Sequence, residues 1–389
     1  MSKTEALQNE AERLKRSLEE RIDTEKLKDT LDISHFDLNA VLRGMQLTLV
    51  GAHRALQNPA IFTNEHYRQA AIAVIVGIAI RLIVSVPIIG VRVLIWFISL
   101  AYPLDSVTWD ESITGTLNFI EEYVLQIPFF LMALMRYVVP TLDNLFMQSL
   151  NWVDRTYVQK HKNENPDDLR DMYYPNLQLY HAEGKKKKSE GTTQALTAFL
   201  YRFARKGLIS LLVFALSYLP FFGRFVLPAA SFYTFNNAAG LGPAAVVFGT
   251  GLFIPRRYLV VFLQTYFASR SLMRELLEPY FARVYFTKEQ KRNWFRSRGG
   301  VLFGFGLGFY ILIKVPLVGV LVYGIAEASA AYLITKITDP PPPPSDMEVY
   351  AASQQVWRNK HDFLSLPVMN LDQLHHQSTR DKAPTSQIE

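Results

Sequence analysis

The stretch I313-K-V-P-L-V-G-V-L-V-Y-G324 lies in the middle of an apolar run that extends from Val301 to Ile337. Pro316 removes a backbone donor and Gly319 accepts backbone angles that other residues avoid, so the pair predicts a break in a helix. The arm before the break would be about 20 Å long as a helix, whereas a bilayer core is roughly 30 Å thick. The stretch therefore favours a re-entrant helical hairpin with its tip at Pro316–Gly319. The alternative is a proline kink in a tilted span.

The same Pro-x-x-Gly signature occurs twice more, at Pro87–Gly90 and at Pro220–Gly223, each inside a long apolar stretch. The first of these stretches, residues 70–101, would be about 48 Å long as one helix, which is too long for a simple span. Unpaired backbone at membrane depth costs several kcal/mol per group, so we expect the tips to be buried against one another.

Glycines recur at every fourth position at the start of the last apolar run, as Gly300, Gly304 and Gly308. Small residues with this spacing form a smooth helix face that lets another helix approach closely. The three glycines are therefore predicted to serve helix packing.

The composition favours a membrane protein of the all-α class. Hydrophobic residues make up 49% of the chain and are concentrated in runs separated by charged stretches. The net charge of +6 suits loops that face anionic headgroups better than it suits nucleic acid. We expect a polytopic integral membrane protein with Pro-x-x-Gly-broken helices and amphipathic interfacial helices.

Changes in composition divide the chain into five expected segments. They are a charged N-terminal helix over 1–36, a first membrane unit with an interfacial helix over 37–153, a polar basic linker over 154–206, a second membrane unit over 207–338, and a proline-rich disordered tail over 339–389. Within the second unit, Thr287 and Gln290 have the spacing of a capping box and predict a helix that begins there.

The acidic stretch 103–122 carries no Lys or Arg, which favours a lumenal position. That position requires residues 70–101 to cross the membrane once as a kinked span. A droplet-resident form requires the same stretch to be cytosolic, and the sequence leaves both arrangements open.

Five ionisable residues fall within or beside the apolar runs: Arg81, Arg92, Arg224, Lys314 and Glu327. Such residues are costly inside a membrane and are candidates for function. In the interpretation that we favour, the arginines reach to headgroups and Lys314 pairs with Glu327 across the last hairpin. In the alternative, Arg81, Arg92 and Lys314 line a path for an anion.

Motifs for catalysis and metal binding are missing from the sequence. It contains no Gly-x-Ser-x-Gly elbow, no phosphate-binding Gly-x4-Gly-Lys-Ser/Thr loop and no His-Glu-x-x-His. His375 and His376 lack a third ligand, and the absence of cysteine excludes thiolate sites. We expect a protein that is not an enzyme, with no catalytic, cofactor-binding or metal-binding residues.

Several apolar motifs resemble the signature of the CysZ and etoposide-induced membrane-protein superfamily, whose members have helical hairpins that partly penetrate the bilayer. The matching residues are Arg298, Phe303-Gly304, Ile313-x-Val-Pro316 and Ala330-Ala331. One departure is Gly319, because bacterial members tend to place Asn after the hairpin proline.

A closer resemblance is to the fungal outer-spore-wall-assembly branch, whose members are associated with lipid droplets. It covers roughly residues 40–345 and is carried by the stretches G51-A-H-R-A-L-Q-N-P59, R274-E-L-L-E-P-Y-F-A-R283 and A331-Y-L-I-T-K-I-T-D339.

This resemblance implies a non-enzymatic membrane protein of lipid droplets and endoplasmic reticulum that supports outer spore wall assembly or droplet-linked lipid handling during sporulation. The implied partners are membrane lipids, together with further copies of the chain or other membrane proteins, and no nucleic acid. The alternative is an anion transporter or channel for a sulfate-like ion, similar to CysZ.

Overall fold

A computed structural model shows an all-α protein, which confirms the expected class. The structure describes residues 37–62, 142–165, 169–180, 192–217, 219, 223–239, 241–251, 253–315 and 319–373, with the single positions 75, 90, 93 and 97. No strand occurs among these residues.

The helices follow one another along the chain as α3 (Leu38–Leu56), α7 (Leu142–Lys160), α8 (Tyr173–Leu179), α10 (Thr192–Leu216), α11 (Gly223–Ala239), α12 (Leu241–Gly251), α13 (Arg256–Leu276), α14 (Glu278–Phe281), α15 (Lys288–Ser297), α16 (Gly299–Ile313), α17 (Gly319–Ile337), α18 (Met347–Ser353) and α19 (Lys360–Ser365). Short 3-10 turns are η2 (Pro59–Phe62), η5 (Pro344–Asp346) and η6 (Val368–Gln373). Of the helices in the described ranges, none combines the length and the apolar character needed to cross a membrane.

The chain divides into two compact units. The smaller unit holds Leu216–Leu259, with α11 and α12 packed against each other. The main unit holds the described parts of Phe36–Ala215 and Val260–Glu389.

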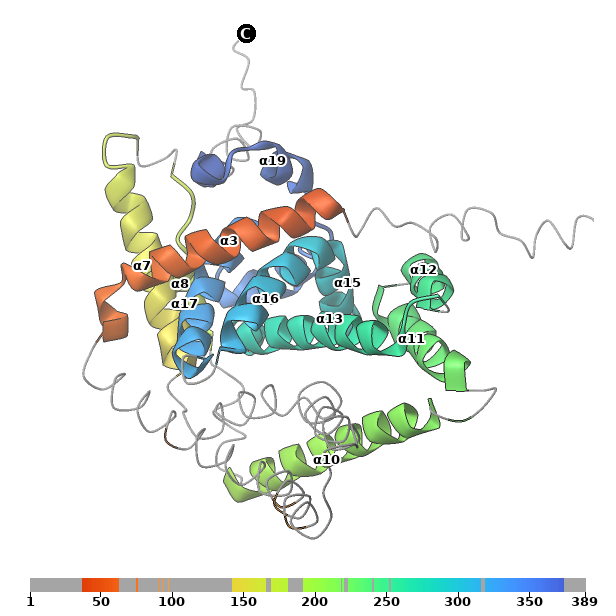
Figure 1. Ribbon diagram of the computed structural model, residues 1–389. Coiled ribbons are helices and arrows are strands. Elements are labelled where there is room, and N and C mark those ends of the chain that lie inside the picture. Colours follow the sequence, from red (N-terminus) through yellow and green to blue (C-terminus); the bar gives the residue numbers. More distant parts are fainter. Residues whose placement is uncertain are drawn as a thin grey trace, which may run out of the picture. The chain divides into compact units, whose positions relative to one another are not determined.

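The centre of the main unit is an antiparallel hairpin made of α16 and α17. The two helices contact each other, and the Arg298 side chain before α16 donates from Nε to the carbonyl of Ile337 at the end of α17, 2.7 Å away. Helix α3 contacts both members of the pair and lies across them in Figure 1, and α7 contacts α17. The Gln264 amide of α13 donates to the Tyr310 hydroxyl of α16. The hairpin is thus covered by helices that lie far from it in the sequence.

Helix α16 approaches α3 closely because glycines line the contact on both sides. A Cβ added at Gly304 would overlap the Val41 carbonyl oxygen, and one added at Gly44 would overlap the Val301 carbonyl oxygen. At Gly300 an added Cβ would lie 2.9 Å from the Ala40 Cβ. Backbone therefore meets backbone along this crossing, and larger residues would force the helices apart.

The expected linker over 154–206 is partly helical and partly buried. Helix α7 continues to Lys160, and its residues Asp154 and Tyr157 are buried. Leu177 of α8 is fully buried in the core of the main unit. A few apolar residues of this polar segment therefore belong to the core of the main unit. The Lys185–Lys188 run lies outside the described residues.

The tail expected to be disordered from residue 339 is ordered as far as residue 373. Helices α18 and α19 and the turns η5 and η6 bury Tyr350, Phe363 and Leu371, and the Arg43 guanidinium of α3 donates to the Leu364 carbonyl. A few apolar anchors among polar residues are enough to fix the segment. Residues 374–389 lie outside the described range.

The proline run at the start of this segment is held by one face of the α8 helix. The Asn176 amide donates to the Pro341 carbonyl at 2.7 Å, and the Tyr180 hydroxyl donates to the Pro342 carbonyl at 2.5 Å. Pro343 has φ −55° and ψ 157°, which is close to a polyproline II conformation. Proline carbonyls have no internal hydrogen bonds in this conformation, so side chains of α8 can bind them.

Candidate functional site

Two of the three Pro-x-x-Gly segments have the same backbone geometry. In the smaller unit, the Leu219 amide donates to the Leu216 carbonyl at 3.1 Å and the Gly223 amide to the Leu219 carbonyl at 3.0 Å. The last segment repeats this pattern in the same register. The Val315 amide donates to the Leu312 carbonyl at 3.2 Å, and the Gly319 amide donates to the Val315 carbonyl at 3.0 Å. The repeated signature therefore encodes a repeated turn.

Glycine is required at the end of each of these turns. A Cβ added at Gly223 would overlap the Ser217 carbonyl oxygen, and one added at Gly319 would overlap the Ile313 carbonyl oxygen, six residues earlier in both cases. Gly90 differs, because it is helical and an added Cβ would meet nothing within 4 Å. Pro87, Pro220 and Pro316 lie outside the described residues.

The candidate charges of the apolar runs are only partly placed. Lys314 is half-buried at the end of α16, with its Nζ 5.1 Å from the centroid of the Tyr310 ring. Glu327 is buried on α17, eight residues beyond Gly319 and thus about 12 Å along the helix from the turn. The predicted pairing of Lys314 with Glu327 therefore stays a prediction.

The structure describes less of the three arginines that were predicted as candidate charges. Arg81 and Arg92 lie outside the described residues, and of Arg224 only its helical position in α11 is described. The anion path, which was the alternative interpretation, therefore stays a prediction.

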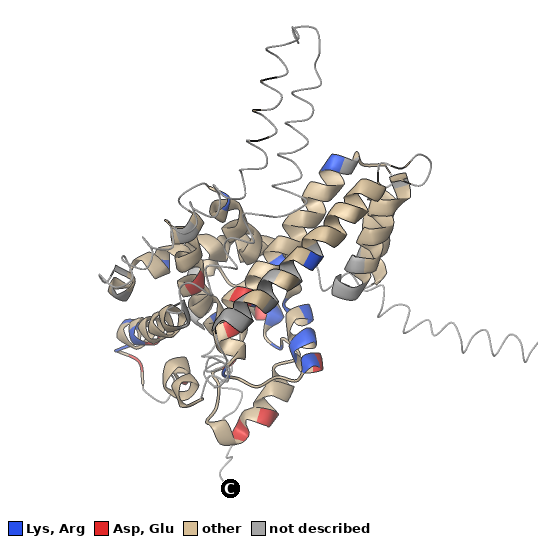
Figure 2. Cartoon of the chain, turned by 90° about the horizontal axis from the view of Figure 1, so that it is seen from below, with Lys and Arg blue, Asp and Glu red and all other residues tan. Residues whose placement is uncertain are grey.

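Large apolar side chains are exposed on α10 and in the smaller unit. The sequence from Leu208 to Pro255 holds a single charged residue, Arg224. Within it, Phe253 is 89% exposed, and further exposed residues are Leu208, Leu212, Leu216, Phe225, Tyr233 and Val246. Figure 2 shows that long stretches of the described helices carry no charged residue. Exposed apolar surface on this scale marks a contact with a partner or with lipid.

Helix α3 has two opposite faces with different uses. Its small residues pack on α16 and α17 on the side that also buries Val41 and Leu47, whereas its other large apolar residues are exposed. Leu38 and Leu49 are each 70% exposed, and Leu42 and Met45 lie between them on the same stripe. The amphipathic helix expected from the sequence thus has an exposed leucine face.

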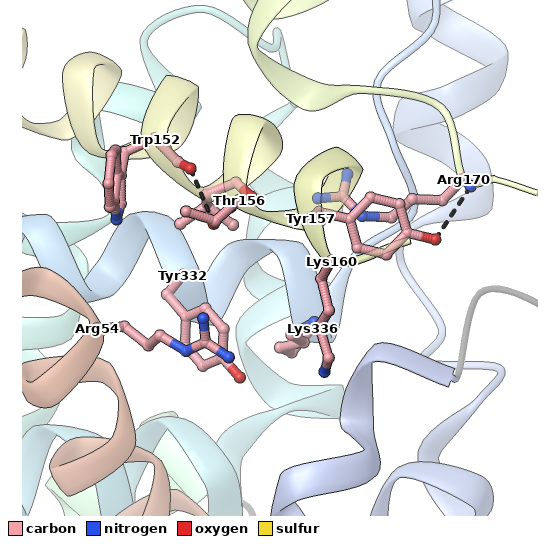
Figure 3. A pocket seen from close by; sticks show the side chains of 9 residues that line it. Arg54, Trp152, Thr156, Tyr157, Lys160, Arg170, Tyr332 and Lys336 are labelled. Carbon is pink, nitrogen blue, oxygen red and sulfur yellow. Dashed lines mark hydrogen bonds between the residues drawn. The ribbon is translucent and has the colours of Figure 1, made fainter. Parts of the chain in front are cut away.

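A pocket rich in cations lies between α3, α7 and α17 of the main unit. Its lining comprises Arg54, Trp152, Val153, Thr156, Tyr157, Lys160, Arg170, Tyr332 and Lys336. Figure 3 shows the basic side chains entering the same space from separate elements. We call this space the basic pocket.

Arg170 forms one wall of the basic pocket. Its Nη2 donates to Asp154 Oδ1 at 2.9 Å, and its guanidinium lies over the rings of Tyr157 and Tyr173, at 4.3 and 4.9 Å. Within the described part of the chain, its Nε–H is buried without an acceptor. The wall is therefore rigid and holds one unused donor.

The other cations come from the last turns of three helices. Lys336 on α17 is only 4% exposed, with its Nζ 5.2 Å from the Tyr332 ring centroid. Arg54 is half-buried near the end of α3, and Lys160 is the last residue of α7. Trp152, Thr156 and Lys160 are spaced by four residues, so they form one stripe of α7.

The sequence carries two local signals for this pocket. Lys336 lies inside the apolar run that ends at Ile337, so it is as unusual as Lys314. The spacing of Trp152, Thr156 and Lys160 indicates a shared helix face. Their convergence with Arg54 depends on contacts between residues more than 90 positions apart, which no local pattern encodes.

A second buried group, centred on Arg298, joins the last hairpin to the C-terminal segment. The Arg298 guanidinium donates to the carbonyls of Ile337 and Gln354, at 2.7 and 2.9 Å, and lies 4.7 Å from the Trp294 ring centroid. Burial lowers the pKa of Arg298 to about 10, which leaves it charged at neutral pH. Its carbonyl partners belong to helix ends, where a cation is stabilised.

The part of the chain that the structure covers contains no group of three or more His, Cys, Asp or Glu residues able to hold a metal ion. Comparison with protein-family models, with curated proteins and with solved structures gives no match to this chain. The resemblance to the fungal branch and to CysZ therefore rests on the quoted motifs, and it remains a prediction.

Proposed function

We propose that this chain is a non-enzymatic membrane protein of endoplasmic reticulum and lipid droplets, embedded through broken helices that return to the face from which they enter. The observation that carries the proposal is the set of exposed apolar side chains on α10 and, separately, in the smaller unit. There, exposed residues such as Leu212 and Phe253 accompany a single charged residue over the whole stretch from Leu208 to Pro255.

The repeated turn supports the same proposal. A segment that enters a bilayer and returns must bond its backbone internally, because hydrocarbon offers no partners. The turns ending at Gly223 and Gly319 bond their amides to carbonyls three or four residues earlier. Beside the second turn, Ile311, Val315 and Leu321 are exposed and apolar, which differs from the expectation that the tips are buried against one another, so this tip suits a lipid environment.

The exposed leucine face of α3 supports an additional contact in the plane of the interface. A helix with one large apolar face and one face fixed to the protein lies at the boundary between headgroups and acyl chains. A lipid droplet has only a phospholipid monolayer at its surface, and hairpins that return to one side suit such a layer. The role in outer spore wall assembly is supported by the sequence resemblance alone.

Imaging of the tagged full chain with a neutral-lipid dye tests this function, combined with flotation of membranes after alkaline carbonate extraction. The wild-type chain should float with the membrane fraction and coincide with droplets. The double variant Val246→Asp with Phe253→Asp places charge among the apolar side chains of the smaller unit, where each carboxylate costs roughly 2.5–3.5 kcal/mol in a lipid environment. It should leave the droplets.

A matched control carries Val349→Asp with Val356→Asp, because these valines are similarly exposed but belong to the C-terminal segment. The control should behave as wild type. Release of the wild-type chain by carbonate, or equal loss of both double variants from droplets, would contradict the proposed function.

A further inference from the structure

We propose that the basic pocket binds a phosphate group, and this inference deepens the proposed function by naming the lipid chemistry that the protein recognises. Cations from α3, α7 and α17 and from the segment before α8 line one pocket that also contains Trp152 and Tyr332. The aromatic rings provide an apolar wall beside the charges, as a site for an ester of phosphate requires.

The charge of the pocket suits a phosphate. Its lining includes four cations, Arg54, Lys160, Arg170 and Lys336, and Asp154 pairs with Arg170. Three helix ends nearby contribute roughly −0.5 elementary charge each. A phosphate ester carries between one and two negative charges at neutral pH, so it complements a lining that contains four cations.

The arrangement of donors also favours phosphate over a carboxylate. The cations come from four separate elements, whereas a carboxylate presents its two oxygens in a single plane. The enclosed space measures about 20 Å³, which is room for one oxygen atom of the anion, with the rest of the group at the mouth. The buried Nε–H of Arg170 is a donor without an acceptor in the described part of the chain.

Cations in the last turn of a helix also have a purely structural use, because they offset the helix dipole. That use accounts for each of Arg54, Lys160 and Lys336 separately. It does not account for their convergence on one pocket.

Ligand titration tests the site with the purified full-length chain in an uncharged detergent. The probes are dioctanoyl phosphatidic acid, inorganic phosphate, and dioctanoylglycerol, which has the same acyl chains without the phosphate. Tryptophan emission reports binding, since Trp152 lines the pocket, and the thermal midpoint reports stabilisation. Phosphatidic acid should bind saturably and raise the midpoint, and dioctanoylglycerol should do neither.

The variants Arg54→Gln and Lys160→Gln should each bind phosphatidic acid at least about tenfold more weakly, because each removes a charged donor. Both residues are at or near helix ends, and an unchanged midpoint without ligand shows that the fold is intact. The matched control is Lys162→Gln, which removes an exposed charge two residues beyond Lys160 and should bind as wild type.

The two phosphate probes distinguish the source of the ligand. Binding of phosphatidic acid alone assigns the pocket to a lipid headgroup, and comparable binding of inorganic phosphate assigns it to a free phosphate compound. Equal affinity of wild type and Arg54→Gln, or equal shifts from dioctanoylglycerol, would overturn the site. If the wild-type chain still floats with membranes in that case, the proposed function stands without this pocket.

Discussion

At the scale of single residues, the main unit depends on positions where a side chain would not fit. Gly304 and Gly44 bring the backbones of α16 and α3 into contact. Arg298 closes the base of the hairpin through hydrogen bonds to two main-chain carbonyls. The close helix contact requires glycine and the two hydrogen bonds require arginine, so a single substitution tests each of them.

Gly304→Ala should lower the free energy of unfolding by about 2–3 kcal/mol, because the added methyl group overlaps the Val41 carbonyl and the helices must separate. Gly299→Ala is the matched control on the same helix, since an added Cβ there meets nothing within 4 Å. Denaturant titration in detergent should place the control within about 0.5 kcal/mol of wild type. Equal effects of the two variants would disprove the close crossing of α3 and α16.

Arg298→Lys should destabilise the protein by about 2–4 kcal/mol although the charge is kept. Lysine has a single ammonium group and cannot bond the Ile337 and Gln354 carbonyls through the planar fork that arginine provides. The comparison is Arg296→Lys at an exposed position two residues earlier, which should be neutral. A wild-type melting midpoint for Arg298→Lys would show that the buried fork is dispensable.

Alkaline pH should destabilise the main unit through its buried tyrosines. Burial raises the pKa of Tyr173, Tyr280 and Tyr350 above the ordinary value of 10.0. Above pH 10 the unfolded chain releases these protons while the folded chain retains them, so stability falls as pH rises. The pKa of Arg298 is lowered by burial, so this group alone makes the folded state more stable as pH rises above 10. The three tyrosines outweigh this one group.

The free energy of unfolding between pH 9 and 11.5 measures this effect. Tyr280→Phe should flatten the decline by up to about 1.4 kcal/mol per pH unit, since one titrating group is lost. An exposed tyrosine, Tyr285, provides the control substitution to Phe. A decline of the same slope in Tyr280→Phe would exclude this hydroxyl as its source.

At the scale of elements, the chain uses one turn twice. Ser217–Gly223 and Ile313–Gly319 share the spacing, the two amide bonds and the close approach of glycine to the carbonyl six residues earlier. Because the two segments lie in different units, their similarity indicates that the local sequence determines the turn. The same glycine substitution can be made in each turn.

Gly223→Ala and Gly319→Ala should destabilise the protein by similar amounts, about 1–3 kcal/mol each, because the added Cβ meets a carbonyl oxygen in the same geometry. Gly90→Ala should be tolerated, since its surroundings are open. Thermal melting of the three variants in detergent checks the comparison. A large destabilisation by Gly90→Ala together with none by Gly319→Ala would contradict the common turn geometry.

Elements that depend on a few neighbouring residues were predictable from the sequence. The capping box at Thr287 and Gln290 is confirmed, with both reciprocal hydrogen bonds formed. Helix α16 ends at Ile313 and α17 begins at Gly319, on either side of the Pro-x-x-Gly signature. These features depend on spacings of three to six residues, which a sequence displays directly.

The tail and the basic pocket were not predictable in this way. Proline and polar residues after Thr338 are typical of disorder, yet Tyr350 and Phe363 find their partners on helices far upstream. The pocket joins Arg54, Lys160 and Lys336 only once α3, α7 and α17 have packed. Single apolar anchors and single cations carry no periodicity, so their roles appear only with the tertiary structure.

At the scale of the whole molecule, the proposed function depends on where the last hairpin lies relative to a membrane. Its base, at Arg298, is buried among polar bonds, and its tip exposes Val315 and Leu321. This polarity along the hairpin axis predicts that the tip meets acyl chains while both ends of the hairpin stay on one face. The orientation can be measured directly because the chain contains no cysteine.

Single-cysteine labelling in intact microsomes is the measurement that tests this claim most directly. The variants Arg296→Cys and Val349→Cys mark the two ends of the hairpin, and Val315→Cys marks its tip; all three positions are exposed. A membrane-impermeant maleimide should label both end positions before detergent is added and the tip only afterwards. Labelling of one end and protection of the other would show a crossing, and rapid labelling of the tip in intact membranes would show that it lies outside the bilayer; either result would contradict the account.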